Sequence, residues 1–393
     1  MLTPRSTLTR RVLAALDASP SRIPVLLGGC GIGRSTMLHQ LRERIGRTTA
    51  QYVDVDRSAT TPERFFQSVI TSAPFAAAGE PPVPGARPAF DAVLSFLTRA
   101  RAGTGEPATF LLDEFLEVRT FESFPGLRRV LQDLLDGLSQ SSNRFVLTSR
   151  YTARTLRLLR DRSARFEVIH MPALTAEDAM DLLDLPPASL PGRDSHEAEY
   201  TARVVHALTD GRPAYVRAIA ESLAAMREQD APGRGDVVSV LAGLLSENGA
   251  LAAQCRFSYE LRLHRARGYG ALKAILDILA DEENLTLTEI SHRLQRTPGS
   301  TKDYLSWLED VDLVTSRQKR YSYADPLMRV WVRLHCRPVP VTDDELAREV
   351  HRYAMPRLPH APLEPALVLA GGGTAVVTAN DDDRKEWGII EID

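Results

Sequence analysis

The sequence predicts an α/β fold, in which a parallel sheet with covering helices is followed by a helical region and then by a small module of helices and a hairpin. Between residues 22 and 171, short apolar runs alternate with helical patterns, which is typical of a parallel sheet. After Pro172, strand patterns disappear and apolar residues recur at helical spacing. From about residue 270, short helical patterns precede two β-prone segments.

The composition is that of a globular protein. The 393-residue chain is 44% hydrophobic and 25% charged, with a formal net charge of −3. This length predicts two or three domains, and the charge gives no global attraction to nucleic acid. Cys30, Cys255 and Cys336 form no CxxC pair, which argues against a zinc site or a disulfide framework and favours a reducing compartment. No apolar stretch approaches the roughly 20 residues that cross a bilayer, so we expect a cytoplasmic protein with no membrane partner.

Residues 1–171 are expected to form the first domain. The apolar run at residues 12–16 ends at Asp17 before it reaches the length of a signal peptide, so we interpret it as an amphipathic first helix. Five β-prone runs follow, and they are expected to form the parallel sheet: residues 23–27, 52–55, 110–112, 145–147 and 166–169.

A glycine-rich segment lies directly after the first predicted strand and opens a helical pattern. Its residues are Gly28, Gly29, Cys30, Gly31, Ile32, Gly33, Arg34, Ser35 and Thr36. They match the phosphate loop Gly-x-x-x-x-Gly-Lys-Ser/Thr, except that an arginine replaces the lysine. Glycines let backbone N–H groups surround phosphate oxygens, and the positive N-terminus of the following helix favours an anion. The Ser35 hydroxyl would then bind a magnesium ion.

Arg34 is the main departure from this motif. Arginine keeps the positive charge, but its planar guanidinium is bulkier than an ammonium and reaches phosphates differently. We therefore expect that nucleotide binding is retained and that catalysis through Arg34 is weakened. The alternative is a glycine-rich turn that binds no ligand. Cys30 is interpreted as a small loop residue and not as a nucleophile.

Two acids follow the third predicted strand. Residues 109–114 form an apolar run that ends in Asp113 and Glu114, roughly eighty residues after the loop. Asp113 would hold magnesium directly or through water, and Glu114 would be the general base that polarises the attacking water. Such a strand end is common by chance, so its pairing with a preceding phosphate loop is what makes it specific.

The fourth predicted strand ends in polar residues, Thr148, Ser149 and Arg150. In additional-strand P-loop enzymes, such a strand lies between the first strand and the strand that carries the two acids, so its end faces the γ-phosphate. Each of the three side chains is a candidate sensor of that phosphate. The alternative is a capped strand end that is followed by a helix.

With these motifs in order, residues 5–335 resemble the AAA+-related STAND and archaeal-type ATPases, including relatives of the origin-recognition ATPases. The resemblance implies that residues 28–35 are a Walker A motif, that Asp113 and Glu114 are a Walker B motif, and that residues 148–150 end a sensor strand. It also implies that the cofactors are ATP or ADP and Mg²⁺.

Residues 172–265 are expected to form a helical lid. Thr175 suits a helix N-cap, with Asp178 at the third helical position. This helix follows the fifth strand directly, as the lid does in the resembling families. A trans-acting arginine finger is left open, because three residues suit it: Arg128, Arg129 and Arg144.

Residues 209–215 are similar to the Gly-x-Pro element of these lids, which lies near the nucleotide. The resemblance implies that Pro213 contacts the nucleotide and that Arg212 or Arg217 is a second sensor. The alternative for both arginines is a solvated helix face.

Residues 266–336 are expected to form a winged helix-turn-helix. The three helices and the two strands of the wing are expected at residues 272–279, 288–294, 299–311, 313–315 and 321–323. Residues 323–331 then resemble the Asp-Pro…Trp ending of this module in archaeal-type ATPases.

The partner of this module is left open between DNA and protein. The wing offers Arg317, Lys319 and Arg320 for DNA phosphates. On the third helix, donors are offset by acids: Ser300, Thr301 and Lys302 against Asp303, Glu309 and Asp310. In STAND proteins a winged helix often holds the nucleotide domain inactive instead, and a protein partner or self-association is the corresponding alternative.

Residues 337–393 are expected to be an extension with short strands at residues 367–369, 375–378 and 388–392. Three acids at residues 381–383 would suit a metal-dependent enzyme, but consecutive acids usually form a solvated turn. The leading hypothesis is therefore an ATP-binding switch or ATPase whose nucleotide state positions the winged helix. The alternative is a DNA-binding or scaffold protein with a degenerate site that does not hydrolyse nucleotide.

Overall fold

The computed structural model describes residues 5–75, 84–103, 105–185, 193–228, 236–264 and 268–359. The chain consists of a compact unit, residues 1–359, and a second segment, residues 360–393, which lies outside the described residues. The strands predicted at residues 367–369, 375–378 and 388–392 and the acids at 381–383 belong to that second segment.

The five predicted strands of the first domain are present and parallel. They are β1 (Ile23–Leu27), β2 (Ala50–Asp54), β3 (Thr109–Asp113), β4 (Arg144–Ser149) and β5 (Phe166–His170). The sheet order is β2-β3-β4-β1-β5, which confirms that the fourth strand lies between the first strand and the strand that carries the acids. Strand β2 begins and ends earlier than predicted, because Val55 is the first residue of the short helix α3 (Val55–Ser58).

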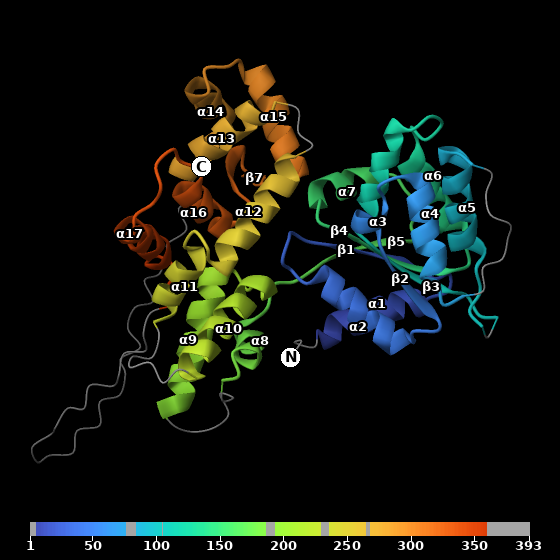
Figure 1. Ribbon diagram of the computed structural model, residues 1–393, viewed down its shortest axis with the longest axis horizontal. Helices are drawn as coiled ribbons and strands as arrows, with labels where there is room; N and C mark the ends of the chain where they lie inside the picture. Colours follow the sequence, from blue (N-terminus) through green and yellow to red (C-terminus); the bar gives the residue numbers. More distant parts are fainter. Residues whose placement is uncertain are drawn as a thin grey trace, which may run out of the picture. The chain divides into compact units, whose positions relative to one another are not determined.

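Helices cover both faces of this sheet (Figure 1). Alternate strand residues point to opposite faces: Leu26 and Val146 pack with α1 (Ser6–Asp17) and α2 (Arg34–Ile45), whereas Phe145 packs on the other side. The helices of that side are α3, α4 (Pro62–Thr71), α5 (Ala86–Arg99) and α6 (Val130–Gln140). The polar ends of β1, β3 and β4 therefore meet at one edge of the sheet, where η1 (Phe115–Ser123) and α7 (Thr152–Leu159) begin.

The region after β5 is helical, as predicted. Its helices are α8 (Ala176–Leu182), α9 (Arg193–Thr209), α10 (Pro213–Glu228), α11 (Val237–Leu245) and α12 (Ala250–Leu263). The expected N-cap is confirmed: the Thr175 hydroxyl accepts from the Asp178 amide, and the Asp178 carboxylate accepts from the Thr175 amide. This reciprocal pair satisfies two backbone donors that the first turn of a helix leaves free.

The next module contains the three predicted helices and the two predicted strands in their predicted order, and it adds β6 and α16, which were not predicted. Its elements are α13 (Tyr269–Asp281), β6 (Leu285–Thr286), α14 (Leu287–Arg293), α15 (Pro298–Asp310), β7 (Val314–Arg317), β8 (Arg320–Tyr323) and α16 (Pro326–His335). We call it the α13–α16 module. Strands β6, β8 and β7 form an antiparallel sheet in that order. Gln318 and Lys319 both have positive φ, which is the two-residue turn that a tight hairpin favours.

The residues after the α13–α16 module begin with a helix that the sequence analysis did not predict, α17 (Asp343–Ala354). Val350 and Tyr353 of α17 share a hydrophobic core with α8–α11 and with Leu327 and Leu334 of α16. The first part of the expected extension therefore belongs to the compact unit.

Among the described residues, no single helix is long and apolar enough to cross a membrane. One bent pair of helices, α11 and α12, passes the same test of length and composition when taken together.

Gly211 packs closely against the backbone of Leu174, and a substitution at Gly211 tests this packing. Its φ is +61°, and an added Cβ would lie 2.3 Å from the Leu174 carbonyl oxygen. We expect Gly211→Ala to lower the free energy of unfolding by on the order of 2 kcal/mol or more, because the left-handed conformation and the backbone clash both act against it. Gly243→Ala in α11 is the matched control, since nothing lies within 4 Å of its added Cβ, and it should raise stability by about 0.5–1 kcal/mol. Equal thermal unfolding midpoints for the two variants would contradict this packing.

Candidate functional site

The glycine-rich loop connects β1 to α2 at the polar edge of the sheet. Gly31 and Gly33 have φ values of +79° and +89°, a conformation that glycine adopts without the strain of a Cβ. Gly33 directly precedes the first residue of α2. The positive end of this 12-residue helix therefore faces the loop, as an anion site requires.

Arg34 folds back over this loop and is only 8% exposed. Its Nη1 donates to the carbonyl oxygens of Gly28 and Gly29, the latter at 2.5 Å. Its Nη2 donates to Glu114 Oε1 at 2.5 Å. The planar guanidinium thus joins the loop after β1 directly to the acid after β3, a contact that a single ammonium nitrogen would not reproduce in the same way.

Glu114 lies between two arginines. Its φ of +56° is uncommon for a residue with a side chain. While Oε1 accepts from Arg34, Oε2 accepts from the Arg150 amide at 2.9 Å and lies 3.1 Å from Arg150 Nε. Burial alone would raise the pKa of Glu114, but the charges of Arg34 and Arg150 and these hydrogen bonds hold the pKa below its usual value. Glu114 is therefore a weaker proton acceptor here than an isolated glutamate.

Arg150 extends the buried ion pairs outward. Its Nη2 donates to Asp56 Oδ2 at 2.6 Å, a partner that the sequence analysis did not identify. Burial would lower the pKa of Arg150, but Glu114 and Asp56 raise it above its usual value. The predicted sensor Arg150 therefore contacts the predicted base Glu114, and a chain of charges runs Arg34, Glu114, Arg150, Asp56.

Asp113 has a separate set of partners. Its Oδ2 accepts from the Tyr52 hydroxyl at 2.8 Å, and its Oδ1 accepts from the Thr148 hydroxyl. The Thr148 oxygen also accepts from the Glu114 amide at 3.0 Å. The structure thus brings together the predicted Asp113 and Thr148, and it adds Tyr52 from β2.

The predicted residues Ser35 and Ser149 of this edge do not take part in the contacts of Asp113 and Glu114 described above. Ser35 is exposed, and no hydrogen bond joins its hydroxyl to Asp113 among the described residues. The Ser149 hydroxyl accepts from the Tyr151 amide at 3.1 Å, as the capped strand end would require. Within the part of the chain that the structure describes, no group of three or more His, Cys, Asp or Glu side chains is arranged to hold a metal ion.

The helical region after β5 contacts the glycine-rich loop through the segment at residues 209–215. The Ala214 amide donates to the Gly31 carbonyl at 3.1 Å, and Pro213 lies next to Gly33. Arg212 Nη1 lies 3.3 Å from the position of an added Cβ on Gly29. Of the two candidate sensors, Arg212 is thus the one beside Gly29, while Arg217 is exposed and borders a small cavity with Pro213.

Arg212 also contacts the base of the β7–β8 hairpin. Its Nη2 donates to the Ala324 carbonyl at 3.0 Å, and its Nη1 lies 3.3 Å from Asp325 Oδ2. Asp325 also accepts from the Tyr215 hydroxyl at 2.7 Å and caps the first turn of α16. One arginine therefore links the phosphate loop to the α13–α16 module.

Residues at the end of α15 make a second link, which sequence reasoning missed. Asp312 Oδ2 accepts from the Thr152 amide at 2.5 Å and so caps α7. Asp310 pairs with Arg157 of the same helix. These partners are about 150 residues apart in the sequence, so no local sequence pattern predicts that they meet.

Sequence reasoning also missed Arg262 of α12, although the sequence contains a pattern that could have identified it. It lies on the buried face of α12 with Cys255, Ser258 and Tyr259, so a charged residue occupies an apolar stripe at helical spacing. Next to it is Cys30: burial would raise the pKa of this thiol, but Arg262, Arg34 and Arg150 lower it below its usual value.

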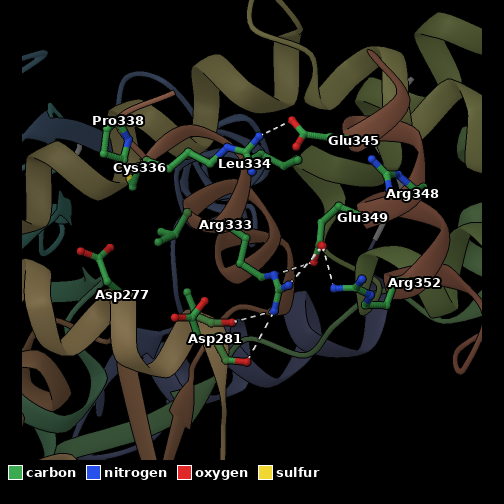
Figure 2. Close-up of a pocket in the computed structure, with 13 residues that line it drawn as sticks. Asp277, Asp281, Arg333, Leu334, Cys336, Pro338, Glu345, Arg348, Glu349 and Arg352 are labelled. Carbon is green, nitrogen blue, oxygen red and sulfur yellow. Dashed lines mark hydrogen bonds and ion pairs between the residues drawn. The ribbon is translucent and has the colours of Figure 1, made fainter. Parts of the chain in front are cut away.

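A larger cavity of about 540 Å³ is lined by residues of α13, α16 and α17 and by none of the phosphate loop. Figure 2 shows Arg333 between Asp281 and Glu349. Arg333 Nε lies 2.6 Å from Glu349 Oε1, and Arg333 Nη1 donates to the Ala280 and Asp281 carbonyls. Arg352 also forms an ion pair with Glu349. These pairs join α16 to α13 and α17, so we interpret the cluster as structural.

No family model and no curated protein matches the sequence. Among solved structures, the chain is similar to the Walker-type ATPase paby2304 of Pyrococcus abyssi, with a TM-score of 0.61 and 16% identity over 84% of this chain and 96% of that chain. Orc1 of Aeropyrum pernix, solved in complex with DNA, gives a TM-score of 0.42 and 18% identity over 84% and 91% of the two chains. A RuvB variant of Thermotoga maritima gives a TM-score of 0.41 and 13% identity over 86% of this chain and 96% of that chain. With the strand order above, the first likeness confirms the predicted P-loop α/β fold.

Asp312 gives the link to α7 a pH dependence. Burial raises the pKa of Asp312 from 3.8 to about 6, although the Thr152 amide and Arg262 act in the opposite direction. The folded protein therefore binds this proton more tightly than the unfolded chain, so the contribution to stability is full below about pH 4 and is lost as the pH rises through about 6. We expect Asp312→Asn, which stays uncharged, to gain on the order of 1–2 kcal/mol over wild type between pH 5 and pH 8.

The measurement is thermal or urea unfolding at several pH values. Asp303→Asn is the control, because Asp303 is an exposed acid of the preceding helix α15, and the gain in stability expected for Asp312→Asn should not appear in it. A pH-independent difference for Asp312→Asn as well would argue against a raised pKa at this position.

Proposed function

We propose that this chain is a nucleotide-dependent switch of the AAA+/STAND type, which binds ATP or ADP with Mg²⁺ at Gly28–Thr36. We further propose that the α13–α16 module is a winged helix whose position depends on the bound nucleotide. The observation that carries the proposal is the position of Arg212 between the two sides: its guanidinium lies beside Gly29 of the loop and binds Ala324 and Asp325 at the hairpin base. A phosphate at the loop would compete for the same cation that holds the hairpin.

The loop residues fit a nucleotide phosphate. The positive φ of Gly31 and Gly33 and the N-terminus of α2 suit an anion, and the exposed Ser35 hydroxyl and the Asp113 carboxylate are oxygen ligands of the kind that Mg²⁺ prefers. Arg34 would exchange Glu114 for a phosphate oxygen, which forms equally strong charge-assisted hydrogen bonds. That exchange would also free Glu114 to accept a proton.

Slow turnover is part of the proposal. The general base Glu114 has both oxygens bound and a lowered pKa, so hydrolysis would require that Arg34 leaves it. This contact supports the expectation of weak hydrolysis, and it also favours the second candidate, a scaffold protein whose nucleotide site does not hydrolyse.

Contacts of the α13–α16 module favour protein over DNA as its partner. Asp310 and Asp312 bind α7 of the nucleotide domain, so these acids serve a contact within the chain. In the wing, Arg317, Lys319 and Arg320 are all exposed, and Arg320 also donates to the Asn284 carbonyl, so these three cations are the ones available to a DNA phosphate. A role in holding the nucleotide domain therefore agrees better with the contacts than a DNA-binding role.

Nucleotide binding is the first test of this function. Titration of the purified protein with a fluorescent ATP analogue and Mg²⁺ should saturate, and Gly33→Val should raise the dissociation constant about tenfold or more, because a branched residue strains the left-handed position. Gly299→Val is the control, since nothing lies within 4 Å of that position. Absence of binding by the wild type at millimolar nucleotide would refute the proposal.

Turnover separates the two candidate functions. We expect Arg34→Lys to raise the ATPase rate on the order of tenfold, because a compact ammonium on a flexible stem can follow the γ-phosphate and no longer holds Glu114 with a planar fork. Glu114→Gln should reduce whatever hydrolysis exists by about 10²-fold while sparing binding. If neither change alters the phosphate-release rate, the site binds nucleotide without catalysing its hydrolysis, as the scaffold candidate requires.

A further inference from the structure

Arg262 is the most deeply buried cation beside the phosphate loop. It is 4% exposed, and it comes from the last turn of α12, far in sequence from every motif of the site. Its Nη2 lies 3.9 Å from the position of an added Cβ on Gly29; burial acts to lower the pKa of Arg262, whereas the neighbouring Cys30 acts to raise it. The guanidinium therefore points into the first half of the loop.

No salt bridge joins this cation to a carboxylate within the described residues. The other buried arginines of the site are paired, Arg34 and Arg150 with Glu114, and Arg212 with Asp325. Within the described ranges, Arg262 forms no ion pair with an acid at 4.0 Å or less: its Nη1 donates to the Asp312 backbone carbonyl at 2.9 Å, and its buried Nε has no hydrogen-bond partner. An unpaired charge with a free donor is costly to bury.

An anion at the loop would remove this cost. The free Nε and the adjacent Nη2 form the edge of a guanidinium that binds phosphate with two parallel hydrogen bonds. A cavity of about 360 Å³ also borders Arg262, together with Asp56 and Tyr151, so the side chain is not enclosed on every side by protein atoms.

We infer that Arg262 is a ligand of the nucleotide phosphates and that it divides its donors between the phosphate and the Asp312 carbonyl. This inference rests on the proposed function and extends it: the phosphate-binding set includes a residue of α12, and the hairpin base is held at two points. Arg212 binds it at Ala324 and Arg262 binds it at Asp312, and the Ala324 amide donates to Leu313 between them.

The test is competition against a fluorescent ATP analogue by ATP, ADP and adenosine. Arg262→Gln should weaken the binding of ATP and of ADP about tenfold or more, which is the usual effect of losing a charge-assisted hydrogen bond. The affinity for adenosine should stay within about twofold of the wild-type value. A residue that only held the hairpin would change all three affinities alike or none of them. Arg256→Gln is the matched control, because Arg256 is exposed on the same helix.

The outcomes separate this inference from the proposed function. If the wild type binds no ATP, the proposed function fails. If the wild type binds ATP and a folded Arg262→Gln binds it with unchanged affinity, only the role of Arg262 is refuted. If Arg262→Gln does not fold by circular dichroism, Arg262→Lys is used instead, because lysine keeps the charge but not the paired donors of a guanidinium: it should weaken the binding of ATP and ADP but not of adenosine, and equal effects on all three would overturn the inference.

Discussion

Burial of arginine beside the phosphate loop is the constraint on which the site depends. A guanidinium cannot lose its charge at physiological pH, so each buried one needs an anion or a full set of acceptors. Arg34 and Arg150 meet this need by sharing Glu114, and Arg212 meets it with Asp325. The positions of β1, β3 and β4 are thereby tied to one another, and the lid is tied to the residues that precede α16.

This constraint explains why the substitution of arginine for lysine is more than a change of size. A lysine at position 34 would offer one nitrogen, whereas Arg34 reaches Gly28, Gly29 and Glu114 at once. The same geometry that stabilises the loop also joins Arg34 to Glu114. In the proposed function, phosphate binding and hydrolysis therefore depend on one side chain, because the cation that would attract a phosphate is also a cation that lowers the pKa of Glu114.

The contacts of the acids in and after α15 could not be inferred from their charge alone. In the sequence they count against recognition of DNA, because they repel phosphates. In the structure Asp310 pairs with Arg157 of α7, so its charge has a partner within the chain. Asp312, which follows α15, accepts from the Thr152 amide at the start of the same helix α7. The β7–β8 hairpin retains Arg317, Lys319 and Arg320 as exposed cations, yet the contacts around the base of the hairpin are directed toward the glycine-rich loop and the helical region after β5.

The sequence by itself determined the local part of this protein. Alternating apolar runs predicted five strands, the Gly28–Thr36 pattern predicted the loop, and Thr175 with Asp178 predicted a cap, because each depends on residues close together in the chain. Helix α17 was missed because its Thr342 cap was not recognised and because its apolar face is completed by the lid.

Only the tertiary structure decided which charges meet. Arg34 and Glu114 are 80 residues apart, Arg212 and Asp325 more than a hundred, and Arg262 could be suspected only as a charge on the buried stripe of α12. Periodicity reports which side of an element is buried and not which partner covers it. The pairing of buried charges depends on distances between elements that folding alone establishes.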